Sequence, residues 1–249
     1  MTGAAGEIGS AVSSAFADAG ARVVLLDADS ARGKALEAEL SDVHGEGVAL
    51  SIAADITDGA AVAAYMSETK ETFGRLDAIV NCAGVEGEIV DAHEYSEAEF
   101  DRVMDINVKG TWLNFRHGVP LMLESGGGSI VNISSGAGLR ALPGLSAYVA
   151  SKHAVIGITR SCAVELATLG VRVNALAPGP VESPMMDSLE RGMSGLSAEQ
   201  ARELYLERVP MKRYGAAREI AQVALFLASD DASYVTGAVI SVDGGATAA

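Results

Sequence analysis

The sequence predicts a doubly wound α/β fold, in which helices cover both faces of a mainly parallel sheet. Along the 249 residues, short apolar runs alternate with longer segments of helical period, which is the rhythm of successive βαβ units. Hydrophobic residues make up 49% of the chain and charged residues 20%, a balance typical of a globular protein. No linker, low-complexity run or internal repeat divides the sequence, so we expect a single domain over residues 1–249.

Each predicted element follows from local pattern. Six short apolar runs are expected to be strands: Arg22–Asp27, Val48–Ala54, Leu76–Asn81, Ser129–Ser134, Val171–Ala177 and Ala238–Val242. Segments of helical period are expected to be helices: Ile8–Ala19, Ser30–Leu40, Gly59–Phe73, Glu97–Glu124, Ala147–Leu169 and Ala217–Leu227. The polar stretch Glu182–Arg208 is expected to be a mobile insertion that forms a substrate loop. In a sheet of this kind the ligand crevice lies at the carboxyl ends of the strands.

Composition limits the classes of partner. With 18 basic and 33 acidic side chains, the formal net charge of −15 repels phosphate backbones and anionic membranes, so neither nucleic acid nor a membrane is expected as a partner. No apolar run reaches the roughly 18 residues of a membrane span, and the N-terminus lacks a signal-peptide pattern, which predicts a cytoplasmic protein. Cys82 and Cys162 are expected to be free buried thiols. The four histidines lack zinc-ligand spacing, so no metal is expected.

Tyr148 and Lys152 form the most informative pair. Four residues apart in a predicted helix, their side chains share one face, so the ammonium group of Lys152 can lie near the phenol of Tyr148. A tyrosine with a pKa of roughly 10 is a poor base at neutral pH, and a neighbouring cation lowers that pKa. Ser135, thirteen residues before the tyrosine, has a hydroxyl that can hold a substrate oxygen. This group is predicted to transfer protons.

The same residues belong to a longer ordered set. A glycine loop at residues 2–9 is followed by Asn81-Cys82-Ala83-Gly84, Asn107, Ile133-Ser134-Ser135, Tyr148 with Lys152, and Pro178-Gly179. This set resembles the short-chain dehydrogenase/reductase family from Thr2 to about Gly245. The resemblance implies a Rossmann-like oxidoreductase that interconverts secondary alcohols and ketones.

The resemblance also assigns roles to the catalytic residues. Tyr148 would be the acid/base, and Ser135 would steady the reacting oxygen. Lys152 would lower the pKa of the tyrosine and bond the nicotinamide ribose. Asn107 would orient a water that connects Lys152 to solvent. Because neighbouring strand-end residues point in opposite directions, Ser134 is expected to be structural.

The glycine loop is expected to hold the cofactor pyrophosphate. Gly3 and Gly9 fit the family pattern, because glycines let the backbone approach a dinucleotide closely before a helix begins at Ile8. Glu7 replaces the usual middle glycine, and Gly6 lies one position earlier. A carboxylate here would repel pyrophosphate unless it points into solvent, although it suits the first turn of a helix.

Asp27, at the end of the following strand, predicts NAD(H) as the cofactor. A carboxylate there can accept hydrogen bonds from both adenine-ribose hydroxyls, and positions 4–7 offer no basic residue for a 2′-phosphate. Arg32 is expected to be a solvated helix residue, poorly placed for that task. By resemblance, the other cofactor residues are Asp55 and Ile56 at the adenine, Asn81, Ala83 and Gly84 at the ribose and diphosphate, and Pro178, Gly179, Val181 and Ser183 beside the nicotinamide.

In this family a buried first strand precedes the glycine loop, yet only Met1 stands before Thr2-Gly3. Several buried apolar side chains at roughly 1.5–3 kcal/mol each would rival a domain's net stability of about 5–15 kcal/mol. We therefore expect the natural protein to begin upstream of Met1.

The substrate is expected to be a small alicyclic or aromatic-derived secondary alcohol or ketone. Three segments, Gly87–Ala92, Ala137–Leu145 and Glu182–Tyr205, should wall the pocket. They offer mainly apolar side chains: Leu139, Leu142, Leu145, Met185, Met186, Leu189 and Met193. The long helical segments also carry surplus apolar surface, and family members pair such helices between subunits, which predicts a homotetramer.

Two other functions stay open. A 3-oxoacyl-[acyl-carrier-protein] reductase would need a basic docking patch, which the net charge disfavours but which Arg102, Lys109, Arg116 and Arg140 could form. A nucleotide-binding protein that has lost catalysis would explain Glu7 and the absent first strand. The complete set of Asn107, Ser135, Tyr148 and Lys152 argues against that second alternative.

Overall fold

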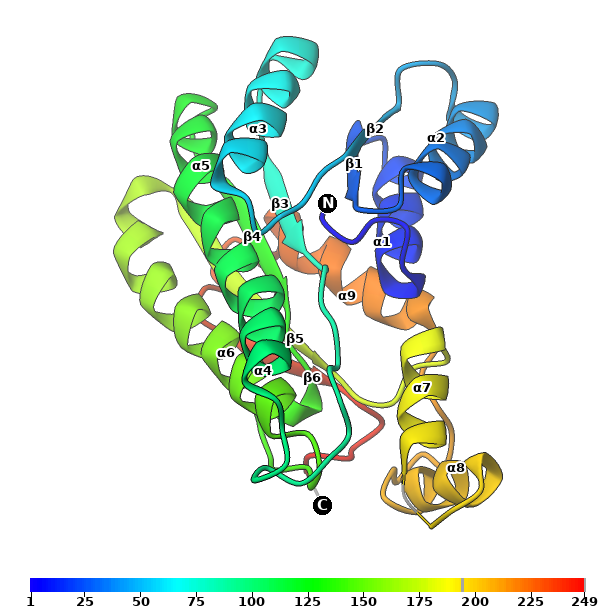
Figure 1. Ribbon diagram of the computed structural model, residues 1–249. Coiled ribbons are helices and arrows are strands. Elements are labelled where there is room, and N and C mark those ends of the chain that lie inside the picture. The colour runs from blue at the N-terminus through cyan, green and yellow to red at the C-terminus, as the bar shows by residue number, and fades with distance from the viewer. Residues whose placement is uncertain (194, 249) are drawn as a thin grey trace.

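The structure is a computed structural model that describes residues 1–193 and 195–248. It confirms the α/β fold with a parallel sheet between layers of helices (Figure 1). The strands are β1 Val23–Asp27, β2 Ala49–Ala53, β3 Ala78–Asn81, β4 Gly128–Ile133, β5 Val171–Pro178 and β6 Val239–Val242. β1 pairs with β2, and β3, β4, β5 and β6 pair in that order; every pairing is parallel.

The segment before the glycine loop joins the two parts of the sheet. Thr2 makes parallel bridges to Leu26 of β1 and Asn81 of β3. The Thr2 N–H donates to the Val80 carbonyl (3.1 Å), and the Ala4 N–H donates to the Leu26 carbonyl (3.2 Å). The glycine loop is therefore anchored between β1 and β3, at the point where the sheet order reverses.

Helices pack on both faces because alternate strand residues point to opposite sides. In β4, Val131 packs toward α1 Glu7–Asp18 and α9 Ala217–Ala228, whereas Ile130 packs toward the opposite layer. That opposite layer contains α3 Gly59–Phe73, α5 Gly110–Glu124 and α6 Ser146–Leu166. α2 Ser30–His44 covers β1 and β2. Both strand residues are fully buried, so each face of the sheet supports its own hydrophobic core.

Two predicted helices are interrupted in the structure. The stretch expected as one helix, Glu97–Glu124, consists of α4 Glu97–Met104, a π-helical turn η1 Asp105–Lys109, and α5. The helix expected to end at Leu169 becomes a 3₁₀ turn, η3 Ala167–Leu169, because Gly170 terminates it with a left-handed backbone (φ 77°). Short π-helical and 3₁₀ turns interrupt a helix without changing which of its residues are apolar, so the spacing of apolar residues in the sequence does not reveal them.

The expected mobile insertion is largely helical. It contains α7 Pro184–Gly192 and α8 Ala198–Glu207. Ser197 and Gln200 form a reciprocal capping box at the start of α8, a pattern that was present in the sequence. Of the residues described, none lies in a helix long and apolar enough to cross a membrane.

Candidate active site

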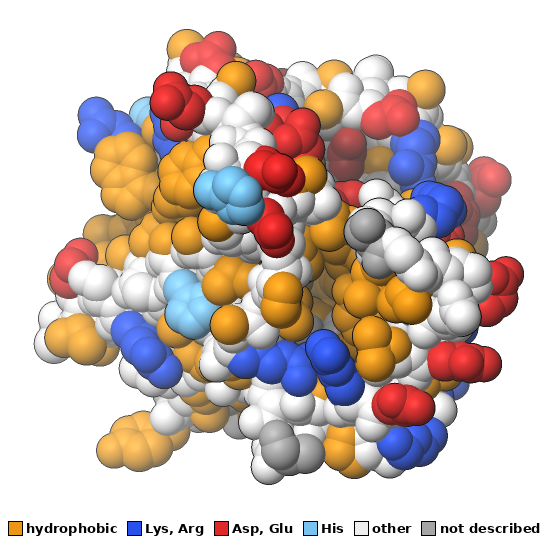
Figure 2. Space-filling view, turned by 60° about the horizontal axis from the view of Figure 1, so that its bottom comes forward, with side chains coloured by type: hydrophobic (Ala, Val, Ile, Leu, Met, Phe, Trp, Pro, Cys, Tyr) orange, Lys and Arg blue, Asp and Glu red, His pale blue; other side chains and the backbone are white. Residues whose placement is uncertain are grey.

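One cavity of about 520 Å³ opens at the carboxyl ends of the strands. The carboxyl ends of the first five strands and the loops after them all contribute to its wall: Asp27, Asp55, Ala83, Ser135 and Gly179 are examples, one from each. Figure 2 shows the hollowed face, with hydrophobic side chains around the hollow and Lys and Arg side chains at one edge. The location matches the crevice expected for a doubly wound sheet.

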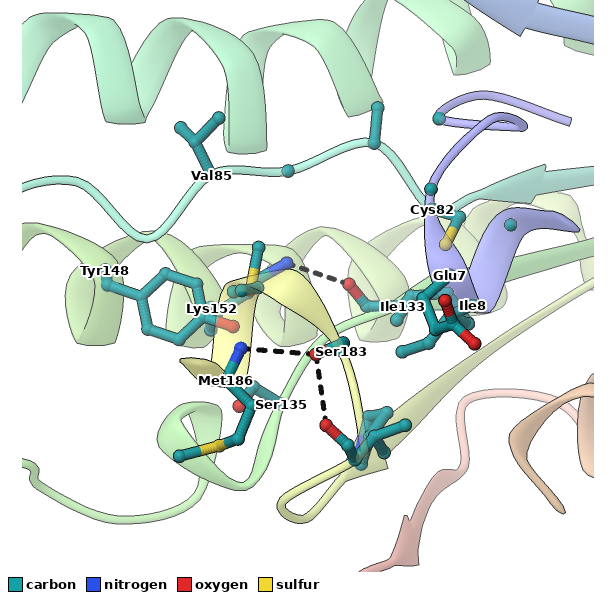
Figure 3. A pocket seen from close by; sticks show the side chains of 18 of the residues that line it. Glu7, Ile8, Cys82, Val85, Ile133, Ser135, Tyr148, Lys152, Ser183 and Met186 are labelled. Carbon is teal, nitrogen blue, oxygen red and sulfur yellow. Dashed lines mark hydrogen bonds between the residues drawn. The ribbon is translucent and has the colours of Figure 1, made fainter. Parts of the chain in front are cut away.

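Tyr148 and Lys152 come from adjacent turns of α6 and line this cavity (Figure 3). They are 7% and 4% exposed, and the Lys152 Nζ lies 5.5 Å from the centroid of the tyrosine ring. Lys152 donates a hydrogen bond to the Ile133 carbonyl (3.0 Å). Burial lowers the pKa of Lys152 to about 8, because desolvation penalises the charged ammonium.

The pKa of Tyr148 moves opposite to the sequence-based prediction. Burial raises it to about 12, with the hydroxyl of Ser135 opposing that shift. The expectation that Lys152 brings this pKa down is therefore wrong for this structure, because desolvation of the phenolate is the largest cause and the charge of Lys152 is not among the causes. The protonated phenol is the form that donates a proton.

The two adjacent serines point in different directions, as predicted. Ser135 lines the cavity, and its Oγ accepts a hydrogen bond from the Ala137 N–H (3.1 Å) at the 3₁₀ turn η2 Gly136–Gly138. Ser134 is buried, and its Oγ donates to the Lys152 carbonyl (3.0 Å). Ser134 thus ties β4 to α6, while Ser135 keeps its hydroxyl at the cavity.

Asn107 is held in the π-helical turn and is 1% exposed. Its Nδ2 donates to the Val85 carbonyl and to the Ser151 Oγ (both 2.9 Å), and its Oδ1 accepts from the Val85 N–H (2.8 Å). Ser151 in turn donates to the Tyr148 carbonyl (2.7 Å). Asn107 lies behind the described cavity wall. Both amide hydrogens are bonded within the protein, so this side chain ties the loop after β3 to α6, and the expected role of Asn107 in orienting a water stays a prediction.

The glycine loop has little room for side chains. A Cβ on Gly3 would lie 2.7 Å from the Ala83 Cα, and one on Gly9 would lie 1.9 Å from the Gly3 carbonyl oxygen. Gly3 also has a φ of 63°, in the region that favours glycine. Gly6 closes the turn by donating its N–H to the Gly3 carbonyl (3.1 Å). The loop therefore packs closely against the backbone after β3 and has no room for side chains at positions 3 and 9.

The departure at Glu7 is accommodated locally. Glu7 begins α1, and its side chain is exposed (Figure 3). A carboxylate in the first turn interacts favourably with the helix dipole. Gly6, the cap, has no side chain to bond the first N–H groups of α1, and Gly6, Glu7, Ile8 and Gly9 all line the cavity. A helix start of this kind fits a pyrophosphate.

Asp27 has a fixed place beside this loop. Its Oδ2 accepts from the Ala5 N–H (2.8 Å), and its Oδ1 accepts from the Asp29 N–H (3.0 Å). Each carboxylate oxygen has a further lone pair, so ribose hydroxyls can still bond it. Arg32 is an exposed residue of α2, as predicted, and it also lines the cavity.

Asp55 and Ile56 line the cavity as predicted. The N–H and hydroxyl of Thr57 both donate to the Asp55 Oδ1 (2.8 Å each), and these bonds lower the pKa of Asp55. Ala83 and Gly84 also line the cavity, and a Cβ on Gly84 would lie 3.2 Å from the Lys152 Nζ. The residues present therefore fit a dinucleotide along this side of the cavity.

Asn81 is the exception among the predicted cofactor residues. Its side chain is buried inside the sheet, where Nδ2 donates to the Asn132 Oδ1 (2.8 Å), and it is not part of the described wall. Asn81 is the last residue of β3, and its side chain points into the core. Cys82 lines the cavity instead, and burial raises the pKa of its thiol to about 11. A neutral thiol agrees with a packing role.

The loop after β5 closes the other side. Pro178, Gly179, Val181 and Ser183 all line the cavity, as predicted. The Ser183 hydroxyl accepts from the Met186 N–H (3.2 Å) and donates to the Val181 carbonyl (3.0 Å), which starts α7 (Figure 3). Ser183 thus fixes the helix that covers the cavity.

The remaining wall is mostly apolar. Leu142, Leu145, Met185, Met186 and Leu189 line it as predicted. Leu139, which is largely exposed, and Met193 are not among the described residues that do. Arg140 and Tyr205 also line the wall. Both lie within the segments predicted to wall the pocket, but the prediction named only apolar side chains in those segments and so did not include them.

Known proteins match almost the entire chain. A family model described as enoyl-(acyl carrier protein) reductase matches residues 3–247. Levodione reductase of Leifsonia aquatica is 39% identical over 249 residues, covering 100% of this chain and 93% of that protein. The 2-(R)-hydroxypropyl-CoM dehydrogenase of Xanthobacter autotrophicus is 40% identical over 253 residues, with coverages of 100% and 97%. The 3-oxoacyl-[acyl-carrier-protein] reductase FabG of Thermotoga maritima is 39% identical over 245 residues, with coverages of 98% and 95%.

Solved structures agree with these matches. The crystal structure of levodione reductase superposes with a TM-score of 0.96 at 39% identity, covering 100% of this chain and 96% of that one. NAD⁺-bound xylitol dehydrogenase superposes with a TM-score of 0.93 at 32% identity, with coverages of 98% and 96%. Similarity of this extent includes the sheet, the covering helices and the loops that wall the cavity.

Proposed function

Because the chain belongs to the short-chain dehydrogenase/reductase family, we propose that it uses NAD(H) to interconvert a small hydrophobic secondary alcohol and its ketone. The oxidation and reduction of secondary alcohols and ketones is the activity that the relatives share. The observation that carries the proposal is the meeting of Ser135, Tyr148 and Lys152 in one cavity with the N-terminus of α1.

In the reducing direction, Tyr148 donates its phenolic proton to the carbonyl oxygen of the ketone. The raised pKa of Tyr148 keeps that proton in place at neutral pH. Ser135 holds the same oxygen through its hydroxyl, and Lys152 is placed to bond the nicotinamide ribose. When bound, NAD(H) supplies or accepts the hydride at the reacting carbon. In oxidation the phenolate form of Tyr148, left after it has given up its proton, accepts the proton of the alcohol hydroxyl, so one residue serves both directions.

Cofactor contacts follow from the wall around α1. The loop of Gly3, Gly6 and Gly9 and the helix start at Glu7 and Ile8 would hold the pyrophosphate. Asp27 would bond the adenine ribose, with Asp55 and Ile56 at the adenine and Ala83 and Gly84 nearby. Pro178, Gly179, Val181 and Ser183 would hold the nicotinamide end.

Preference for NAD(H) over NADP(H) rests on Asp27. Its carboxylate is fixed by two backbone N–H groups and cannot turn away from a 2′-phosphate without losing them. Similar structures contain either NAD⁺ or NADP, so the family alone does not decide. Among the described wall residues near Asp27, Arg32 is the one whose positive charge would favour the 2′-phosphate of NADP(H).

Apolar side chains favour a small hydrophobic substrate over an acyl carrier protein. Leu142, Leu145, Met186 and Leu189 surround the space beside Tyr148. The alternative function has a relative in its favour, but the four basic residues proposed for carrier docking do not form a free patch. Arg102 pairs with Glu99, and Lys109 lies 3.8 Å from Asp105. Arg116 stacks over the Trp112 ring, and Arg140 faces the cavity.

We further propose a homotetramer in the cytoplasm. Trp112 of α5 and Val164 of α6 are largely exposed although both are apolar. Such side chains on neighbouring helices suit a subunit interface. Sedimentation as a stable monomer would contradict the assembly.

Titration with NADH and NADPH, followed by protein fluorescence, tests the cofactor assignment first. We expect NADH to bind at least about tenfold more tightly, a difference of ~1.4 kcal/mol. Equal or tighter binding of NADPH would contradict the role of Asp27 and implicate Arg32. A panel of alicyclic and aromatic ketones then tests turnover, and NADH binding without reduction of any ketone would favour the non-catalytic alternative.

A further inference from the structure

Two polar side chains interrupt the otherwise apolar substrate wall. Arg140 follows the 3₁₀ turn η2 after β4, and Tyr205 lies near the end of α8; both line the cavity. The remaining side chains around them include Leu142, Leu145 and Met186. Neither polar group takes part in the proton transfer or cofactor contacts described above, so their presence in this wall needs a different explanation.

Arg140 has unused hydrogen-bonding capacity. Among the described residues its guanidinium donates one hydrogen bond, from Nη1 to the Ala246 carbonyl (2.9 Å). Its Nε is buried without a partner there. A guanidinium group carries five N–H donors, and buried donors are rarely left unpaired in folded proteins. The bond to Ala246 fixes the side chain while leaving further donors for a ligand.

Tyr205 adds a second donor at the same corner. Burial raises the pKa of its phenol, with the charges of Arg208 and Arg140 opposing that shift, so the hydroxyl stays protonated. No described residue accepts a hydrogen bond from it. Arg140 and Tyr205 line the same cavity, so one ligand can reach both groups.

Three chain segments build this corner. The loop containing Arg140 meets the C-terminal segment through Ala246, and that segment packs on the residues after α8, where Gly244 approaches Val209. The Asp243 carboxylate accepts from the N–H groups of Gly245 and Thr247, which flank the Ala246 carbonyl that holds Arg140. A negative charge therefore lies on the same short segment as the partner of Arg140 and partly balances its positive charge.

We propose that Arg140 and Tyr205 form a second polar subsite, which hydrogen-bonds a neutral carbonyl or hydroxyl oxygen of the substrate remote from its reacting carbon. The balance of Arg140 by Asp243 favours a neutral oxygen over a carboxylate. The preferred substrate is thus a compound with an apolar ring or chain and two oxygens, one at Ser135 and Tyr148 and the other at this subsite. This inference rests on the proposed function and defines its substrate class more narrowly.

A pair of ketones that differ in the second oxygen tests the subsite. We would measure kcat/KM with NADH for 1,4-cyclohexanedione and cyclohexanone, and divide out the twofold advantage of the dione's two equivalent carbonyls. We expect the dione to be preferred about tenfold or more, as for a hydrogen bond to a charged donor. The preference should fall about tenfold in Arg140→Met and by a smaller factor in Tyr205→Phe.

Two controls separate recognition from folding. Tyr205→Phe leaves the bond between Arg140 and Ala246 intact, so a folding defect in Arg140→Met would not decide the result. Arg208→Met removes an exposed arginine near the same helix end, outside the described cavity wall, and should leave the preference unchanged. If loss of positive charge alone lowered the preference, Arg208→Met would lower it as Arg140→Met does, and Tyr205→Phe, which removes no charge, would leave it unchanged.

The outcomes distinguish this inference from the proposed function. Reduction of both ketones with the same preference in wild type, Arg140→Met and Tyr205→Phe overturns the subsite alone. Faster use of 4-oxocyclohexanecarboxylate than of the dione overturns the neutral assignment. If neither ketone is reduced, the proposed function is in question, and binding decides the subsite. With NADH present, 1,4-cyclohexanediol should raise the melting temperature more than cyclohexanol, and an equal effect would refute the subsite.

Discussion

The two halves of the cavity are built from different parts of the chain. The half that is proposed to receive the dinucleotide is formed largely by backbone: a Cβ on Gly9 would collide with the Gly3 carbonyl, and Asp27 is held by two N–H groups. The half assigned to the substrate is formed by side chains such as Leu145 and Met186. Backbone geometry admits few substitutions, whereas a side-chain wall can change shape one residue at a time. One scaffold can therefore keep its cofactor and take different substrates.

The largest expected effect lies where the two halves meet. Tyr148→Phe removes the proton donor while keeping the ring, so kcat/KM should fall by about 10²–10⁴. NADH affinity, measured by fluorescence, should change little. Tyr234→Phe, at a fully exposed position, is the matched control. Retention of full activity in Tyr148→Phe would contradict the assigned role.

A methyl group on the backbone half should have the next largest effect. Gly9→Ala places a Cβ against the Gly3 carbonyl and should destabilise the loop by about 1–3 kcal/mol or more, with loss of NADH binding. Gly157→Ala is the control, since a Cβ in that helix meets no other atom within 4 Å. That change should be neutral or slightly stabilising. Similar NADH affinity and stability in both variants would break the contrast between backbone and side-chain walls.

The buried ammonium of Lys152 should make stability depend on pH. Its folded pKa of about 8 lies below the ordinary 10.5, so between these pH values the unfolded chain binds more protons. The free energy of unfolding therefore rises with pH across this window by up to about 3 kcal/mol, while the full cost of burial is present below pH 8.

Urea unfolding of wild type and Lys152→Met at several pH values measures this contribution. The variant should be the more stable protein near pH 7, and its advantage should shrink toward pH 10. An advantage independent of pH would mean that Lys152 keeps an ordinary pKa.

Where a residue type is forced by geometry, the sequence was informative. Gly3, Gly9 and the Tyr148–Lys152 spacing predicted both location and packing. Predictions failed where a property depends on surroundings. The pKa of Tyr148 is set by burial, which no local pattern states, and Asn81 points into the core because of where β3 ends. The orientation of the Arg140 side chain in the cavity wall depends on a hydrogen bond to Ala246, over a hundred residues away in the chain, which no local pattern predicts.

The π-helical turn at Asp105–Lys109 has a consequence for how this region can vary. Such a turn contains one residue more than an α-helical turn, so it rotates everything after it by about 100° relative to an uninterrupted helix. Removing a single residue there would restore a regular helix and swing Asn107 away from Val85 and Ser151. Single-residue insertions and deletions, more than substitutions, are therefore the changes that would take apart the support behind Tyr148.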